Sequence, residues 1–142
     1  MTEEKQVPIP QGKYVPAVRV HHMVYTAGMT PRQAGKLVST ETILEEKDTA
    51  YYKEIVELAA SNALRAVYAQ LETGEQIQQI VSITVYVRAE ANFTKHSKIA
   101  DLASDWLYRE LGEKGIGCRA AVGVASLPGN APVEIQLSAA VG

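Results

Sequence analysis

Two charged side chains near the C-terminal end of the chain stand out because their neighbours are mostly small and apolar. Arg119 opens a stretch otherwise made of alanine, valine and glycine, and Glu134 lies just inside the final apolar stretch. The planar guanidinium of arginine matches a carboxylate through two parallel hydrogen bonds, so Arg119 is a candidate for binding a carboxylate ligand. A glutamate can orient or deprotonate water, or pass a proton to a substrate, and this is the chemistry considered for Glu134.

Both residues also have a structural interpretation that the sequence alone leaves open. Arg119 can be a strand-end arginine that points into solvent or pairs across an interface, and Glu134 can be the polar half of an alternating strand. A simple hairpin between the two strands would turn at residues 129–130. Glu134 would then lie opposite Ala125, roughly 20 Å from Arg119. A common site therefore requires that the strands are not hairpin partners or that a neighbouring subunit completes it, and we favour a site shared between subunits.

The other reactive residue types give weaker signals. Adjacent residues of a strand point to opposite faces, so His21 and His22 cannot readily chelate one ion. We interpret them as turn histidines, and His96 as a histidine on a helix surface. No histidine lies near Cys118 in the sequence to activate its thiol, so we interpret it as a small hydrophobe. The sequence therefore predicts no metal site.

Composition limits the class of protein. The chain has 142 residues, 46% of them apolar and 21% charged, which fits a single globular domain over residues 1–142 with a polar extension at residues 1–12. The net charge of −2 argues against a nucleic-acid binder that relies on a basic surface. No apolar run approaches the ~20 residues of a membrane span, and the first residues lack the pattern of a signal peptide. We therefore expect a cytoplasmic protein that does not bind membranes.

Hydrophobic periodicity predicts two amphipathic helices and several strands. Apolar residues recur at steps of three and four over residues 49–72 and 93–111. We predict Asp48 and Asn92 as the N-caps of these helices and Gly74 as the residue that stops the first. Period-two alternation and apolar runs bounded by turn residues predict strands at residues 80–87, 119–125 and 133–140, a hairpin or two short strands within 14–26, and a short strand at 36–38.

Two amphipathic helices need one apolar sheet face to cover, which predicts an α/β two-layer sandwich. The other sheet face would carry more charge if it met only water. We expect small or uncharged residues there, namely Ala121, Gly123, Gln136 and Ser138. Such a face suits a packed, partly polar subunit interface, so we expect an oligomer.

The run RAAVGVASLPGNAPVEI at residues 119–135 closely resembles the C-terminal signature of the RidA/YjgF family, also called endoribonuclease L-PSP. The segments YVPAV at residues 14–18 and VYTAGMTP at residues 24–31 resemble the opening hairpin of that family. The resemblance covers residues 7–141. It implies a homotrimer with a chorismate-mutase-like fold, in which a mixed six-stranded sheet carries two helices on one face and ligands bind in clefts between subunits.

The same resemblance implies an activity. Arg119 would hold the carboxylate of a 2-imino acid, Glu134 would position water, and Tyr14 and the backbone of Gly28 would line the pocket. The implied reaction, that of a 2-iminobutanoate/2-iminopropanoate deaminase, hydrolyses imino or enamine acids to 2-oxo acids and ammonia. No cofactor is expected, because the imine carbon is already electrophilic.

The chain departs from the best-understood branch of the family within the pocket. Ala27 stands in place of a serine, and Ala121 in place of a cysteine two residues after the motif arginine. The second helix is longer, so the pocket asparagine corresponds either to Ser97 or to Asp101. These differences indicate a less characterised branch and leave the natural substrate and pathway open.

Two other functions fit the same residues. A non-catalytic sensor or carrier of small carboxylates would use the same arginine without chemistry. An endoribonuclease ranks last, because the chain has no clustered histidine pair and no evident basic groove.

Overall fold

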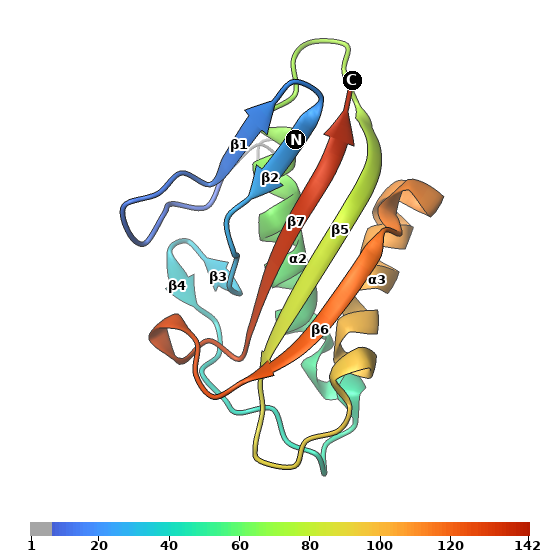
Figure 1. The fold of residues 1–142 in the computed structure, drawn as a ribbon. Helices are drawn as coiled ribbons and strands as arrows, with labels where there is room; N and C mark the ends of the chain where they lie inside the picture. Colours follow the sequence, from blue (N-terminus) through green and yellow to red (C-terminus); the bar gives the residue numbers. More distant parts are fainter. Residues whose placement is uncertain (1–6) are drawn as a thin grey trace.

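The computed structural model describes residues 7–142, and the first six residues of the predicted N-terminal extension lie outside this range (Figure 1). Within the remainder of that extension, Val7 packs against the hydrophobic core. In chain order the elements are β1 (Ala17–Val20), β2 (Met23–Thr26), β3 (Arg32–Gln33), β4 (Lys36–Leu37), the 3-10 helix η1 (Thr49–Tyr52), α2 (Lys53–Tyr68), β5 (Ile77–Arg88), α3 (His96–Leu111), the 3-10 helix η2 (Gly112–Gly115), β6 (Cys118–Val124), the 3-10 turn η3 (Pro128–Asn130) and β7 (Val133–Val141).

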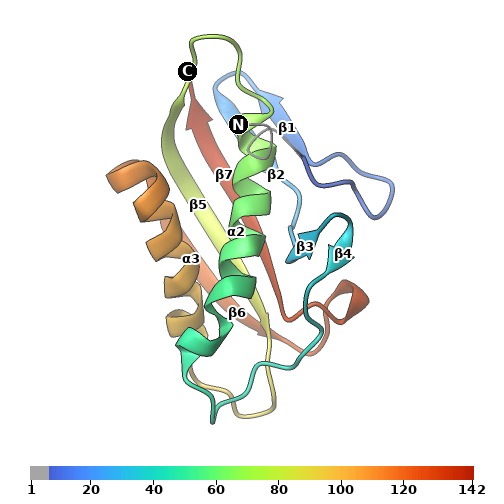
Figure 2. The same cartoon turned by 180° about the vertical axis from the view of Figure 1, so that it is seen from behind.

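Five strands form one sheet in the order β1-β2-β7-β5-β6, and both long helices lie on the same face of it (Figures 1 and 2). β5 and β6 run parallel, whereas the other neighbouring pairs are antiparallel. The two-layer sandwich and the mixed sheet are therefore confirmed. The sheet has five strands rather than the predicted six. The short strand predicted at residues 36–38 is present as β4, but β3 and β4 pair only with each other. Each is two residues long and they are joined by Ala34 and Gly35, both at positive φ, so this short hairpin folds on itself beside the sheet.

The first predicted helix opens with a 3-10 turn at Thr49, its α-helical part begins only at Lys53, and it ends earlier than predicted. The Asp48 carboxylate accepts a hydrogen bond of 3.0 Å from the backbone N–H of Ala50, and it caps the 3-10 turn that leads into α2. α2 ends at Tyr68 rather than at Gly74. Gly74 has a φ of +86° and lies in the turn before β5, so its left-handed backbone serves that turn instead of a helix stop.

The predicted cap of the second helix is wrong. α3 begins at His96, and no side chain caps its first turn. Asn92 has a φ of +71° and lies in the turn after β5, where the Phe93 N–H donates to the Glu90 carbonyl. Asparagine tolerates the left-handed region, which suits this turn as well as a helix cap.

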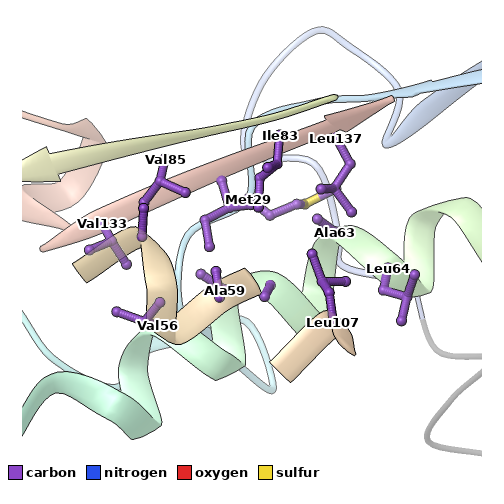
Figure 3. Packing of buried hydrophobic residues seen from close by; sticks show 14 of the residues in the cluster. Met29, Val56, Ala59, Ala63, Leu64, Ile83, Val85, Leu107, Val133 and Leu137 are labelled. Atoms are coloured by element: carbon purple, nitrogen blue, oxygen red, sulfur yellow. The ribbon is translucent and has the colours of Figure 1, made fainter. Parts of the chain in front are cut away.

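The core fills the space between the helices and the covered sheet face (Figure 3). Fully buried alanines of α2 let the helix backbone lie close to its neighbours, while branched and aromatic side chains fill the remaining volume. Buried residues of the core include Val56, Ala59, Ala63, Leu64, Ile83, Val85, Leu107, Val133, Ile135 and Leu137.

The opposite sheet face is open and rich in apolar side chains. Val18, Val20, Tyr25 and Val122 are each between 39% and 52% exposed. By their register these residues lie on the side away from the helices. Val18, Val20 and Tyr25 form an exposed apolar patch on β1 and β2, and Val122 lies on β6 at the other edge, with polar side chains of β7 and β5 between them. An exposed apolar patch is typical of a subunit interface.

Two residues that we predicted for this open face lie on the covered one. Ala121 pairs with Val85 and Gly123 with Val87, and both valines are buried under the helices. Because side chains that pair across neighbouring strands share a face, Ala121 and Gly123 point toward α3.

Candidate functional site

The strands that carry Arg119 and Glu134 are not hairpin partners, since β6 and β7 lie on either side of β5. Arg119 pairs with Ile83, and Glu134 pairs with Tyr86. The two residues are thus offset by three positions along β5 and by two strand spacings across it. At ~3.4 Å per residue and ~4.8 Å per strand, their Cα atoms lie roughly 14 Å apart, closer than the hairpin arrangement would place them.

Arg119 and Glu134 nevertheless point to opposite faces of the sheet. The partner of Arg119, Ile83, is buried under the helices, so the arginine lies on the helix-covered face. Glu134 shares the open face with Tyr86. One subunit by itself therefore does not bring the guanidinium and the carboxylate together.

Arg119 is held by three residues of α3. Its Nη1 donates to Asp101 Oδ1 at 2.8 Å and to Ser104 Oγ at 3.0 Å. Its Nη2 donates to the Ser97 hydroxyl at 2.8 Å and to the Ser97 carbonyl at 3.3 Å. Of the N–H groups of this guanidinium, only the Nε–H has no hydrogen-bond partner among residues 7–142. The arginine thus does not simply point into solvent, because it ties β6 to α3.

The two alternatives for the family's pocket asparagine, Ser97 and Asp101, both contact Arg119. Sequence reasoning did not identify Ser104, the third partner. Its position three residues after Asp101 on an amphipathic helix was the available signal, since residues three apart lie on one helix face.

On the helix-covered face of β6 the residues become smaller along the strand, from Arg119 through Ala121 to Gly123. A Cβ at Gly123 would collide with Nε2 of His96, so this glycine makes room for the imidazole at the start of α3. His96 also makes an edge-to-face contact with Phe93, with ring centroids 5.1 Å apart. His96 is therefore a packed helix-terminal residue, and nothing about its contacts indicates a metal ligand.

Glu134 is half-buried beside Gly28. A Cβ added to Gly28 would collide with the Glu134 carboxylate, so glycine is the residue that lets this side chain lie flat against the loop after β2. Backbone hydrogen bonds between Met29 and Ile135 fix that loop along β7. The Glu134 carboxyl has no hydrogen-bond partner within residues 7–142, and burial raises its pKa above the ordinary value. The structure thus brings Glu134 and Gly28 into contact.

Ala27 and Tyr14 belong to the N-terminal side of this region. The Ala27 N–H donates to the Pro16 carbonyl at 2.8 Å, which ties the loop after β2 to the segment before β1. Tyr14 lies in that segment, is 49% exposed, and accepts a hydrogen bond of 3.1 Å from the backbone N–H of Gln11. β1 and β6 are the two edges of the sheet, so the segment before β1, which carries Tyr14, and β6, which carries Arg119, lie at opposite edges (Figure 1).

The cavities of the single chain lie elsewhere. One of about 550 Å³ is lined by the hairpin region and by α2, and none of the six predicted site residues takes part in it. Among residues 7–142, no cluster of three or more His, Cys, Asp or Glu side chains is arranged to hold a metal ion. No helix in this range combines the length and apolar character that a membrane span requires.

Comparison with known proteins relates the chain to one family. The family described as endoribonuclease L-PSP matches residues 4–141. A 2-iminobutanoate/2-iminopropanoate deaminase from Dermatophagoides farinae is 30% identical over 129 residues, which cover 91% of this chain and 86% of the relative. The crystal structure of a protein of unknown function from Agrobacterium tumefaciens superposes with a TM-score of 0.84 and 31% identity, covering 99% of this chain and 90% of that one. The YjgF gene product of E. coli has a TM-score of 0.69 at 24% identity, with 96% and 94% covered.

Proposed function

This chain belongs to the RidA/YjgF family, and from that premise we propose that it hydrolyses 2-imino and enamine acids to 2-oxo acids and ammonia. The observation that carries the proposal is Glu134, a half-buried carboxyl without a hydrogen-bond partner in the described chain, seated against Gly28. A carboxyl with a raised pKa exchanges protons more readily near neutral pH than an ordinary glutamate does.

The chemistry needs one water molecule and a proton carrier. Water adds to the iminium carbon while the Glu134 carboxylate accepts a proton from it. The same proton then passes to the nitrogen of the resulting carbinolamine. The C–N bond breaks as the C=O double bond forms, and the departing ammonia takes up the proton that the hydroxyl group loses, by way of Glu134. In balance, R–C(=NH2+)–COO− and H2O give R–CO–COO− and NH4+, so no oxidant, reductant or cofactor is required. Arg119 holds the substrate carboxylate and Tyr14 closes the pocket.

The site we propose is shared between subunits of a homotrimer. Arg119 and Glu134 of one chain face opposite sides of the sheet, and Tyr14 lies at the far edge, so one chain offers three separate parts of a site. The exposed apolar open face supports an assembly in which these parts meet. Arg119 of one subunit then completes the Glu134 pocket of its neighbour. We also propose that the protein is located in the cytoplasm.

The direct test measures the decay of 2-iminobutanoate released by a pyridoxal-phosphate dehydratase acting on L-threonine. We expect acceleration over the spontaneous rate. Glu134→Gln should lower kcat about 10²- to 10⁴-fold. Arg119→Ala should raise KM about 10- to 100-fold, the value of a charge-assisted bidentate contact. Arg109 lies elsewhere on α3 and pairs with Glu57 of α2, so Arg109→Ala should leave the rate unchanged.

Mixing the two impaired variants, assayed at a substrate concentration well below the KM of Arg119→Ala, tests the shared site. If Arg119 and Glu134 of each site come from different subunits, randomly mixed trimers of Arg119→Ala and Glu134→Gln regain about a quarter of the wild-type activity, because both intact residues meet at one site in four. No recovery after verified subunit exchange would place both residues in one subunit and refute the arrangement. A monomeric solution mass would refute it as well.

A non-catalytic carrier of small carboxylates is the second candidate. It needs only Arg119, whose Nε–H is free to meet a ligand carboxylate, and it does not need Glu134, which lies on the other face of the sheet. Such a protein would bind 2-oxobutanoate with a loss in Arg119→Ala and would not accelerate imine decay.

A further inference from the structure

The Arg119 guanidinium carries an internal counter-ion. Of the four acceptors on its terminal nitrogens, three are neutral oxygens of Ser97 and Ser104, and only Asp101 is charged. The Asp101 contact is 2.8 Å long, and the arginine side chain is 22% exposed against 57% for the aspartate. The cation of the proposed clamp is therefore presented to a ligand together with an anion at its edge.

This arrangement leaves a defined place for a ligand carboxylate. The free Nε–H and the neighbouring N–H of Nη2 form one edge of the guanidinium fork. The Nη2 contact to the Ser97 carbonyl, at 3.3 Å, is the longest of the four and the one most easily exchanged. A carboxylate can take this edge while Nη1 stays bound to Asp101 and Ser104.

A carboxylate bound there shares one guanidinium with the Asp101 carboxylate, so two anions compete for a single cation and repel each other. Asp101 Oδ2 has no hydrogen-bond partner in residues 7–142, so it is available as an acceptor at the rim of the site. A ligand with a protonated nitrogen next to its carboxylate would donate to that oxygen, which turns the repulsion into attraction. The Arg119–Asp101 pair thus presents one positive and one negative group side by side, which matches a zwitterion better than a simple anion.

We propose that Asp101 is a specificity residue that selects zwitterionic 2-iminium acids over the 2-oxo acids formed from them. This inference rests on the proposed function, and it adds a reason for product release. Hydrolysis removes the N–H donors of the substrate, so the product carboxylate meets Asp101 without a compensating hydrogen bond.

The test compares two stable ligands in the full-length protein by isothermal titration. L-2-aminobutanoate stands in for the zwitterionic iminium acid, and 2-oxobutanoate is the product. Wild-type protein should prefer the amino acid. Asp101→Asn should strengthen 2-oxobutanoate binding about fivefold and weaken L-2-aminobutanoate binding by a similar factor, as expected for one charge–charge contact at a partly exposed site.

Three further variants make the outcome unambiguous. Asp105→Asn removes the same charge from an exposed position of α3 and should change neither affinity. Ser104→Ala removes a neutral partner of Arg119 and should affect both ligands alike. An Asp101→Asn protein that shifts both ligands in the same direction, or neither, overturns the specificity role. Arg119→Ala that binds both ligands as well as wild type refutes the carboxylate clamp of the proposed function, which is a separate result.

Discussion

The contact between Gly28 and Glu134 gives the sharpest quantitative prediction. A Cβ at position 28 would lie 2.7 Å from Glu134 Cδ and 3.0 Å from its Cγ, so Gly28→Ala forces the whole glutamate side chain to move. The carboxyl end is flexible and only half-buried, so we expect a cost near the lower end of overpacking, about 1–2 kcal/mol. The displaced carboxylate would also lower the rate of imine hydrolysis at least about tenfold.

A double-mutant cycle isolates this contact. Glu134→Ala removes the atoms that the new methyl group would meet, so Gly28→Ala in that background should cost close to nothing. The free energy of unfolding is measured by urea denaturation at one fixed protomer concentration, because assembly contributes to the apparent stability. An equal cost of Gly28→Ala in both backgrounds would show that the methyl group collides with something other than Glu134, and the assignment of Gly28 as the pocket glycine would fall.

Three more predictions follow from individual contacts. The hydrogen bond from Arg19 lowers the pKa of Glu75 to about 2, so the pair stabilises the fold above pH 4.5 and this contribution is lost as the pH falls toward 2. Glu75→Gln should therefore lower Tm at pH 7 but not near pH 2, and a pH-independent difference would contradict the ion pair. Asn62 is buried, donates to two backbone carbonyls and accepts from an arginine. Asn62→Ala should therefore lower the free energy of unfolding, measured in urea, by about 2–4 kcal/mol, against under about 1 kcal/mol for Ser61→Ala. Equal losses for the two variants would refute the bridging role of Asn62. Because the pKa of Glu134 is raised, kcat/KM should rise with pH through a limb above pH 4.5 that Glu134→Gln abolishes.

Local patterns predicted the elements well where a residue's neighbours in sequence decide its environment. The final strand was predicted at residues 133–140 and spans Val133–Val141. Burial alternates from Val133 to Leu137, because one face packs on the helices and the other is open, and Ser138 interrupts the pattern because it is buried between β2 and β5. Capping residues were less predictable, since Asn92 and Gly74 also suit tight turns, and the path of the chain into β5 and α3 decided which role each one takes.

The small residues of β6 show why sheet faces escape sequence analysis. Ala121 and Gly123 carry no hydrophobic contrast with Ala120 and Val122, so periodicity does not say which pair points toward the helices. The parallel register with β5 settles this by placing Ala121 beside the buried Val85. A shift of one residue would have reversed the assignment.

The sequence by itself determined that Arg119 and Glu134 are the chemically informative residues, because a lone cation and a lone carboxylate stand out in small apolar strands within a recognisable motif. Only the tertiary structure decided that they face opposite sides of the sheet, because β5 inserts between their strands and sets each register separately. It also decided that Arg119 meets three partners on α3, which lie 15 to 22 residues away in the chain. Contacts at that separation depend on how a helix docks on a strand, which no local pattern encodes.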